Sequence, residues 1–105
     1  MTKYEREVIN RIAKYTNIPR LYWDFETKEY QFVISVLEEI NIIFTNLELL
    51  GLCQENLRKY DDKETIDNIY NAMEQDKQNI ENSFKRLEEL TEQHKQYLGN
   101  MQKEV

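Results

Sequence analysis

Residues 63–98 read KETIDNIYNAMEQDKQNIENSFKRLEELTEQHKQYL, and the spacing of apolar side chains in this stretch decides the fold. Apolar residues return every seven positions, as in a helix that packs lengthwise against another helix. One line of the repeat holds Ile66, Met73, Ile80, Leu87, His94 and, beyond the stretch, Met101. The second line holds Ile69, Leu90 and Tyr97 and is interrupted by Asp76 and Ser83. The pattern predicts one long helix over about 63–98, with a fraying tail toward Val105.

A second long helix is predicted over about 27–60. Stepping 100° per residue from Ile40 collects a wide apolar face, while Ile42 and Leu49 fall on the opposite side, seven residues apart. The expected core face holds Val33, Val36, Leu37, Ile43, Phe44, Leu47, Leu50 and Leu57. A helix that is apolar on both sides is expected to lie between two partners. Gly51 costs a helix about 1 kcal/mol relative to Ala, so a break there, with a short separate helix over 52–60, is the alternative.

The segment between the two helices is a short polar turn, Tyr60-Asp61-Asp62-Lys63. Asp61 and Glu64 have the spacing of a capping box, in which each side chain bonds to a backbone amide of the other. A link this short brings the two helices back along each other. The expected arrangement is an antiparallel hairpin with coiled-coil-like crossing.

The first residues predict a short helix over about 3–16. Thr2 and Glu5 again have capping-box spacing, and Pro19 forbids helix at the residue before it. The connector over 17–26 is rich in large apolar groups rather than Gly and Ser, so it is expected to be ordered. The whole chain, 1–105, is therefore expected to be one all-α domain: a short N-terminal helix plus a long antiparallel helical hairpin, forming a three-helix bundle.

The composition indicates in which cellular compartment the protein is expected and which class of partner is disfavoured. The net charge is −6, and five of the fourteen basic residues but only three of the twenty acidic ones lie in residues 1–25. An acidic chain is a poor general nucleic-acid binder. No signal peptide or membrane span is expected, and the one cysteine, Cys53, cannot close an internal disulfide. The expected location is the cytoplasm of a host cell, most simply a bacterium.

No residue pattern predicts catalysis or a cofactor. His94 is the single histidine, so a two-histidine metal site is excluded, and we interpret it as a half-buried position of the heptad repeat. Cys53 has neither a neighbouring base nor a helix N-terminus to activate its thiol. We therefore expect a protein that is not an enzyme and holds no metal or cofactor.

The leading hypothesis is a small regulator or inhibitor that binds another protein, of the kind that phages and mobile elements encode. Trp, Tyr and Arg dominate the residues that carry binding energy at interfaces. The expected contacts are the connector residues Arg20, Tyr22, Trp23 and Phe25, together with Ile42 and Leu49 on the outward side of the second helix.

Three alternatives remain open at this point. The outward apolar side of the second helix could be buried by a second copy, giving a homodimeric coiled-coil or bundle module. Arg11, Lys14 and Arg20 could instead bind nucleic acid. The eleven carboxylates between Asp61 and Val105 could imitate a phosphate track, although an ordinary solvated surface is the simpler interpretation.

Overall fold

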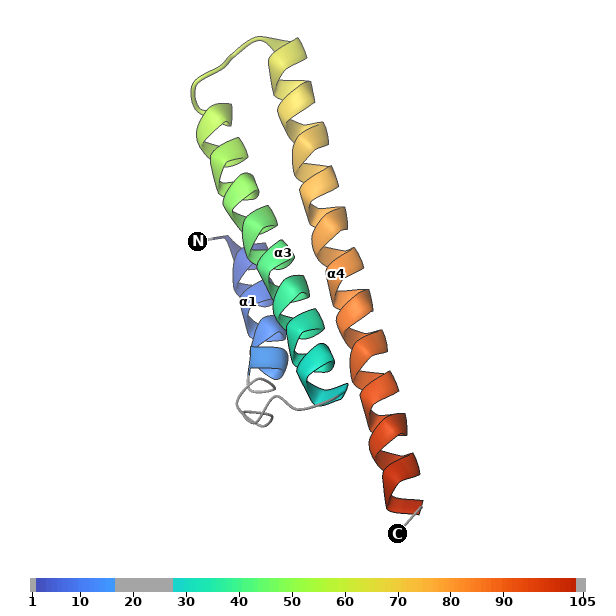
Figure 1. Cartoon of the computed structure of the whole chain (residues 1–105). Helices are drawn as coiled ribbons and strands as arrows, with labels where there is room; N and C mark the ends of the chain where they lie inside the picture. Colours follow the sequence, from blue (N-terminus) through green and yellow to red (C-terminus); the bar gives the residue numbers. More distant parts are fainter. Residues whose placement is uncertain (1, 17–27, 104–105) are drawn as a thin grey trace.

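Three helices make up the described part of the protein in the computed structural model. The structure describes residues 2–16 and 28–103, with side chains over 2–16 and 31–96. Helix α1 spans Lys3–Thr16, α3 spans Lys28–Leu57 and α4 spans Lys63–Lys103. Figure 1 shows α3 and α4 running antiparallel along each other, with the short α1 packed alongside the hairpin. The predicted all-α fold with a long helical hairpin is confirmed.

The hairpin is a rod, and its two arms differ in length. The principal extents of the molecule are 66 × 21 × 19 Å. Helix α3 continues through Gly51, so the alternative with a break is wrong; a side chain at this glycine would meet nothing within 4 Å. Helix α4 continues to Lys103, beyond the expected end near residue 98, and projects past the start of α3 (Figure 1).

Both predicted helix starts have a side-chain cap, one of them shifted by a residue. The amide of Glu5 donates to Thr2 Oγ1 at 3.2 Å, as the spacing predicted. At the start of α4, the amide of Thr65 donates to Asp62 Oδ2 at 3.0 Å. Asp62 therefore caps α4, and the prediction of Asp61 was wrong by one position.

The core lies where α1 covers the hairpin. The heptad positions Ile80 and Leu87 are fully buried, whereas Ile66 and Met73, nearer the turn, are only partly buried. The buried apolar residues are Val8, Ile12 and Tyr15 of α1, Phe32, Val33, Val36, Ile40, Ile43 and Leu50 of α3, and Ile80, Phe84 and Leu87 of α4. Short α1 thus completes the core over only part of the rod.

Two residues assigned to the core of α3 are on its surface instead. Leu37 and Phe44 were expected on the core face, but both are exposed. They lie seven residues apart at the edge of that face, on the side farthest from α4 by helical phase. A single short helix packs against too narrow a strip of α3 to cover this edge as well.

Polar contacts fix the direction of α1. Gln54 Nε2, near the end of α3, donates to Glu5 Oε1 in the first turn of α1 at 3.3 Å. Arg11, two turns later, pairs with Glu81 in the middle of α4. Helix α1 therefore runs antiparallel to α3. Across residues 2–16 and 28–103, no helix is long and apolar enough to span a membrane.

Candidate protein-binding surface

The hairpin has two grooves between α3 and α4, and α1 fills one of them. Arg11 Nη1 and Nη2 donate to the two carboxylate oxygens of Glu81 at 2.8 and 3.2 Å. The same guanidinium lies 3.8 Å from the centre of the buried Phe84 ring, which also contacts Tyr15 at 6.5 Å between ring centres. Arg11 thus serves the packing of α1 against α4.

The predicted nucleic-acid residues are consequently not gathered into a free cationic patch. Arg11 is paired within the fold, and Lys14 is exposed with its ammonium group 5.8 Å from the centre of the Tyr15 ring. Arg20 lies outside the described residues. Of these three predicted residues, only Lys14 is both described and without an ion pair to a carboxylate.

The second groove, which we call the open groove, has a polar lining. Arg86 Nε donates to Glu39 Oε1 at 2.8 Å, and Arg86 Nη2 donates to the fully buried Ser83 at 3.1 Å. Nearer the turn, seven residues along each helix from this pair, Asn79 Nδ2 donates to Asn46 Oδ1 at 3.1 Å. The interrupted heptad line, which holds Ser83, therefore faces the open groove.

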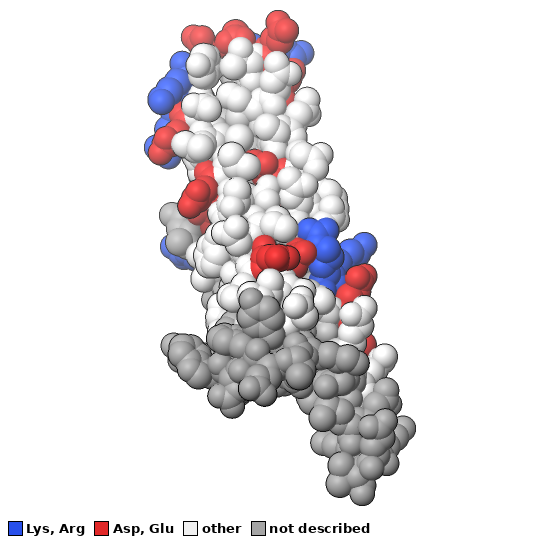
Figure 2. Space-filling model, in the orientation of Figure 1, with Lys and Arg blue, Asp and Glu red and all other residues white. Residues whose placement is uncertain are grey.

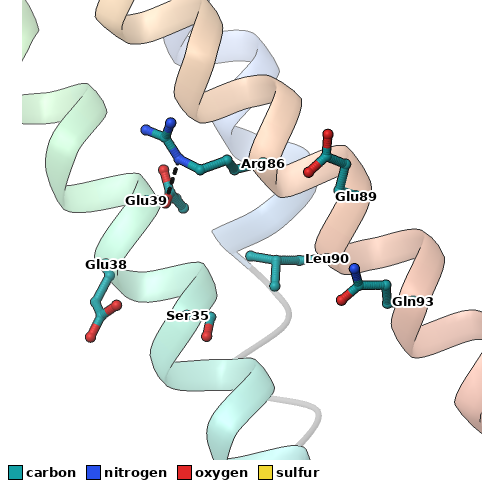
Figure 3. Close-up of a pocket in the computed structure, with 7 residues that line it drawn as sticks. All are labelled: Ser35, Glu38, Glu39, Arg86, Glu89, Leu90 and Gln93. Atoms are coloured by element: carbon teal, nitrogen blue, oxygen red, sulfur yellow. Dashed lines mark hydrogen bonds and ion pairs between the residues drawn. The ribbon is translucent and has the colours of Figure 1, made fainter.

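A cavity of about 260 Å³ opens in this groove near the start of α3. Its lining residues are Ser35, Glu38 and Glu39 of α3 and Arg86, Glu89, Leu90 and Gln93 of α4. Figure 3 shows Glu38 on the α3 side and Glu89 on the α4 side, with the Glu39–Arg86 pair at one end. The Glu39 side chain is only 13% exposed, and its Oε2 has no hydrogen-bond partner among the described residues. The cavity therefore holds more negative than positive charge.

The outward surface of α3 carries several exposed large apolar side chains. Leu37, Phe44, Leu49 and Leu52 are each between 42% and 55% exposed. Of the predicted contacts, Leu49 is exposed as expected, and Ile42 is partly buried. In Figure 2, the face toward the viewer carries few charged side chains between the turn and a charged cluster lower down, and its white residues are uncharged, whether apolar or polar.

The sequence analysis located this surface only in part. It placed Ile42 and Leu49 outward but assigned Leu37 and Phe44 to the core and did not single out Leu52 as a contact. The signal for all five was the same: apolar residues occupy more of the circumference of α3 than one partner helix covers. The other predicted contacts, Arg20, Tyr22, Trp23 and Phe25, lie outside the described residues.

The two residues that the sequence analysis considered for catalysis or metal binding, His94 and Cys53, are in surroundings that favour a structural role. The His94 ring stacks on Phe32, with ring centres 4.1 Å apart and planes 7° apart. Burial, and secondarily the nearby Asp76 carboxylate, raise the pKa of the Cys53 thiol, which disfavours the thiolate needed of a nucleophile. Within the described parts of the chain, no group of three or more His, Cys, Asp and Glu residues is placed to hold a metal ion.

Comparisons with known proteins add no functional information. No family model, curated protein or solved structure matches this chain. The outward surface of α3 and the open groove are therefore the features from which a function can be argued.

Proposed function

We propose that this protein is a small non-enzymatic regulator or inhibitor that binds another protein through the outward surface of α3. The observation that carries the proposal is the set of four large apolar side chains, Leu37, Phe44, Leu49 and Leu52, left 42–55% exposed on one helix. Single exposed apolar residues are common on soluble proteins, but four of them distributed over the outward half of one helix favour an interaction surface. Burying the exposed part of each side chain stabilises a complex by about 1 kcal/mol.

The regularity of α3 supports this role. Helix α3 is continuous over Lys28–Leu57, so the backbone that carries its outward side chains is already ordered before binding. The connector residues Arg20, Tyr22, Trp23 and Phe25 remain proposed contacts of the same interface, because aromatic and arginine side chains provide most of the binding energy at such surfaces. A small interaction protein of this kind suits a phage or mobile element acting in the bacterial cytoplasm.

The alternatives are less well supported. Nucleic-acid binding through Arg11 would require breaking its two bonds to Glu81 and its contact with Phe84. A homodimer through α3 would bury the same apolar residues, and the test below separates it from binding to another protein.

The test compares the double variant Phe44→Ser/Leu49→Ser with Tyr70→Ser, which removes an equally exposed large side chain from α4. Each tagged protein is used for quantitative affinity capture from bacterial cells, and each pure protein is sedimented at micromolar concentration. We expect wild type and Tyr70→Ser to be monomers that retain the same partner. We expect the double variant to retain at least about tenfold less, because two anchors of about 1 kcal/mol each are lost.

Two results would contradict the proposal. Equal retention of the partner by all three proteins would show that the outward surface of α3 is not the binding site. A stable dimer that the double variant dissociates would show that a second copy, rather than another protein, covers α3.

A further inference from the structure

Beyond its first residue, Lys28, the charges on α3 have one sign. Between Lys28 and Arg58 the chain carries no lysine or arginine, while it carries glutamates at 29, 38, 39, 48 and 55. The described glutamates Glu38, Glu48 and Glu55 are exposed, on the same half of the helix as Leu49 and Leu52 by helical phase. The outward surface of α3 is therefore apolar and acidic at once.

The apolar line of α3 leads into the cavity of the open groove. Ser35, Ile42 and Leu49 are spaced seven residues apart and so lie on one side of the helix, in a row about 21 Å long. Ser35 and Glu38 line the cavity from α3 (Figure 3). A binding segment that lies along Leu49 and Ile42 would reach the cavity with its far end.

The cavity is suited to a positive group from such a segment. Its one arginine, Arg86, is bonded to Glu39 and Ser83. Glu38 and Glu89 are exposed on its two sides, and Glu39 Oε2 has no hydrogen-bond donor in the described structure. A lysine or arginine side chain entering here meets carboxylates on both helices, while its methylene stem can lie against Leu90.

We infer that the occupant of this surface is a basic amphipathic helix of the partner protein. Its apolar side chains cover Leu49 and Ile42, and a lysine or arginine about seven residues further along enters the cavity beside Glu38 and Glu89. This inference rests on the proposed function and adds the chemistry of the partner to it. A second copy of α3 fits less well, because it would bring glutamates against glutamates.

The experiment uses two synthetic 18-residue peptides, each about 27 Å long as a helix. One is an amphipathic leucine/lysine helix, and the other is the same pattern with every lysine replaced by glutamate. Binding to the full-length protein is followed by fluorescence anisotropy at about 0.15 M salt, and the contact site is mapped from amide chemical shifts. Glu38→Gln/Glu89→Gln is compared with Glu64→Gln/Asp67→Asn, which removes the same two charges from exposed positions near the turn.

We expect the leucine/lysine peptide to bind at least about tenfold more tightly than the leucine/glutamate peptide, with shifts gathered over residues 35–52 and at the cavity. Glu38→Gln/Glu89→Gln should weaken binding about three- to tenfold, as expected for two partly solvated charge pairs. The control pair should weaken it less than about twofold, because its charges lie more than a screening length from the cavity.

Three results would overturn the inference: equal weakening by both double variants, equal affinity for both peptides, or shifts centred away from α3. Equal weakening by both double variants would show that the peptide is attracted by the overall negative charge of the protein and not by the cavity. If the leucine/lysine peptide does not bind but partner capture still depends on Phe44 and Leu49, the partner does not bind through a basic helix. The proposed function would then still stand. Peptide binding at α3, with partner capture insensitive to Phe44 and Leu49, would contradict the proposed function and show only that α3 can bind a basic helix.

Discussion

The groove filled by α1 and the open groove are built from the same two helices and differ in their chemistry. In the covered groove, apolar Phe84 meets Tyr15, and Arg11 lies over the ring and bonds to Glu81. In the open groove, pairs of polar side chains meet, such as Asn46 with Asn79 and Glu39 with Arg86. One groove is closed by the protein's own chain, and the other is left solvated, beside apolar residues of α3 that α1 does not reach. This difference is why we propose that the side of the rod with the open groove is the one that binds a partner.

The largest expected effect is a difference in how much the two grooves contribute to the free energy of unfolding. Phe84→Ala should lower the free energy of unfolding by about 3–5 kcal/mol, because it empties a fully buried site where α1 meets α4. Leu90→Ala, at the partly exposed cavity of the open groove, should cost about 1–2 kcal/mol. Urea unfolding measures both, and equal losses would show that the two grooves contribute alike.

The charge pairs of the two grooves should also differ. Arg86→Met leaves the Glu39 carboxylate, which is only 13% exposed, without its donor and should cost about 1–3 kcal/mol. Arg11→Met leaves Glu81, which is 46% exposed and can bind water, and should cost about 1 kcal/mol or less. In the double variant Arg86→Met/Glu39→Leu, most of the lost stability should return. A loss at least as large as that of Arg86→Met alone would show that Glu39 is not the source of the cost.

Asp76 should be a net cost to the fold at neutral pH. It occupies the interrupted heptad line and is buried, and burial raises the pKa of its carboxyl group. Because the pKa is raised in the folded state, the folded protein is favoured at low pH, and this advantage is lost as pH rises through the folded pKa. Asp76→Leu should therefore stabilise by about 1 kcal/mol near pH 7 and by less near pH 3. A gain that does not depend on pH would contradict the role of ionisation.

The helices and the hairpin could be predicted from the sequence because their signals are local or periodic. The heptad line through Ile80 and Leu87 predicted the buried seam of α4, and Thr2 marked the start of α1. The cap of α4 was missed by one residue because Asp61 and Asp62 are both good caps. Only the three-dimensional path of the turn selects between them.

The surface of α3 could be predicted only in part, for a physical reason. Helical phase shows which residues share a side, but not how many degrees of that side a neighbouring helix covers. Leu37 and Phe44 sit at the edge of the core face, so the lateral position of α1 decides whether they are buried. The open groove, with Glu39 and Arg86 forty-seven residues apart, depends on the register of α3 against α4, which no local pattern specifies.

The smallest expected effect lies at the turn, where the Asp62 side chain caps the start of α4. Hydrogen bonding with the side chain of Thr65, and secondarily with its amide, lowers the pKa of Asp62 below its ordinary value of 3.8. A carboxyl group whose pKa is lowered by folding stabilises the fold above its unfolded pKa, and the benefit disappears as pH falls through the lower folded value. Asp62→Ala should therefore lower the melting temperature slightly at pH 7 and leave it unchanged well below pH 3.8, where the wild-type carboxyl is also protonated. Asp61→Ala is the matched control. Equal lowering by the two variants at pH 7 would mean that general charge at the turn, rather than the Asp62–Thr65 bond, orders the start of α4.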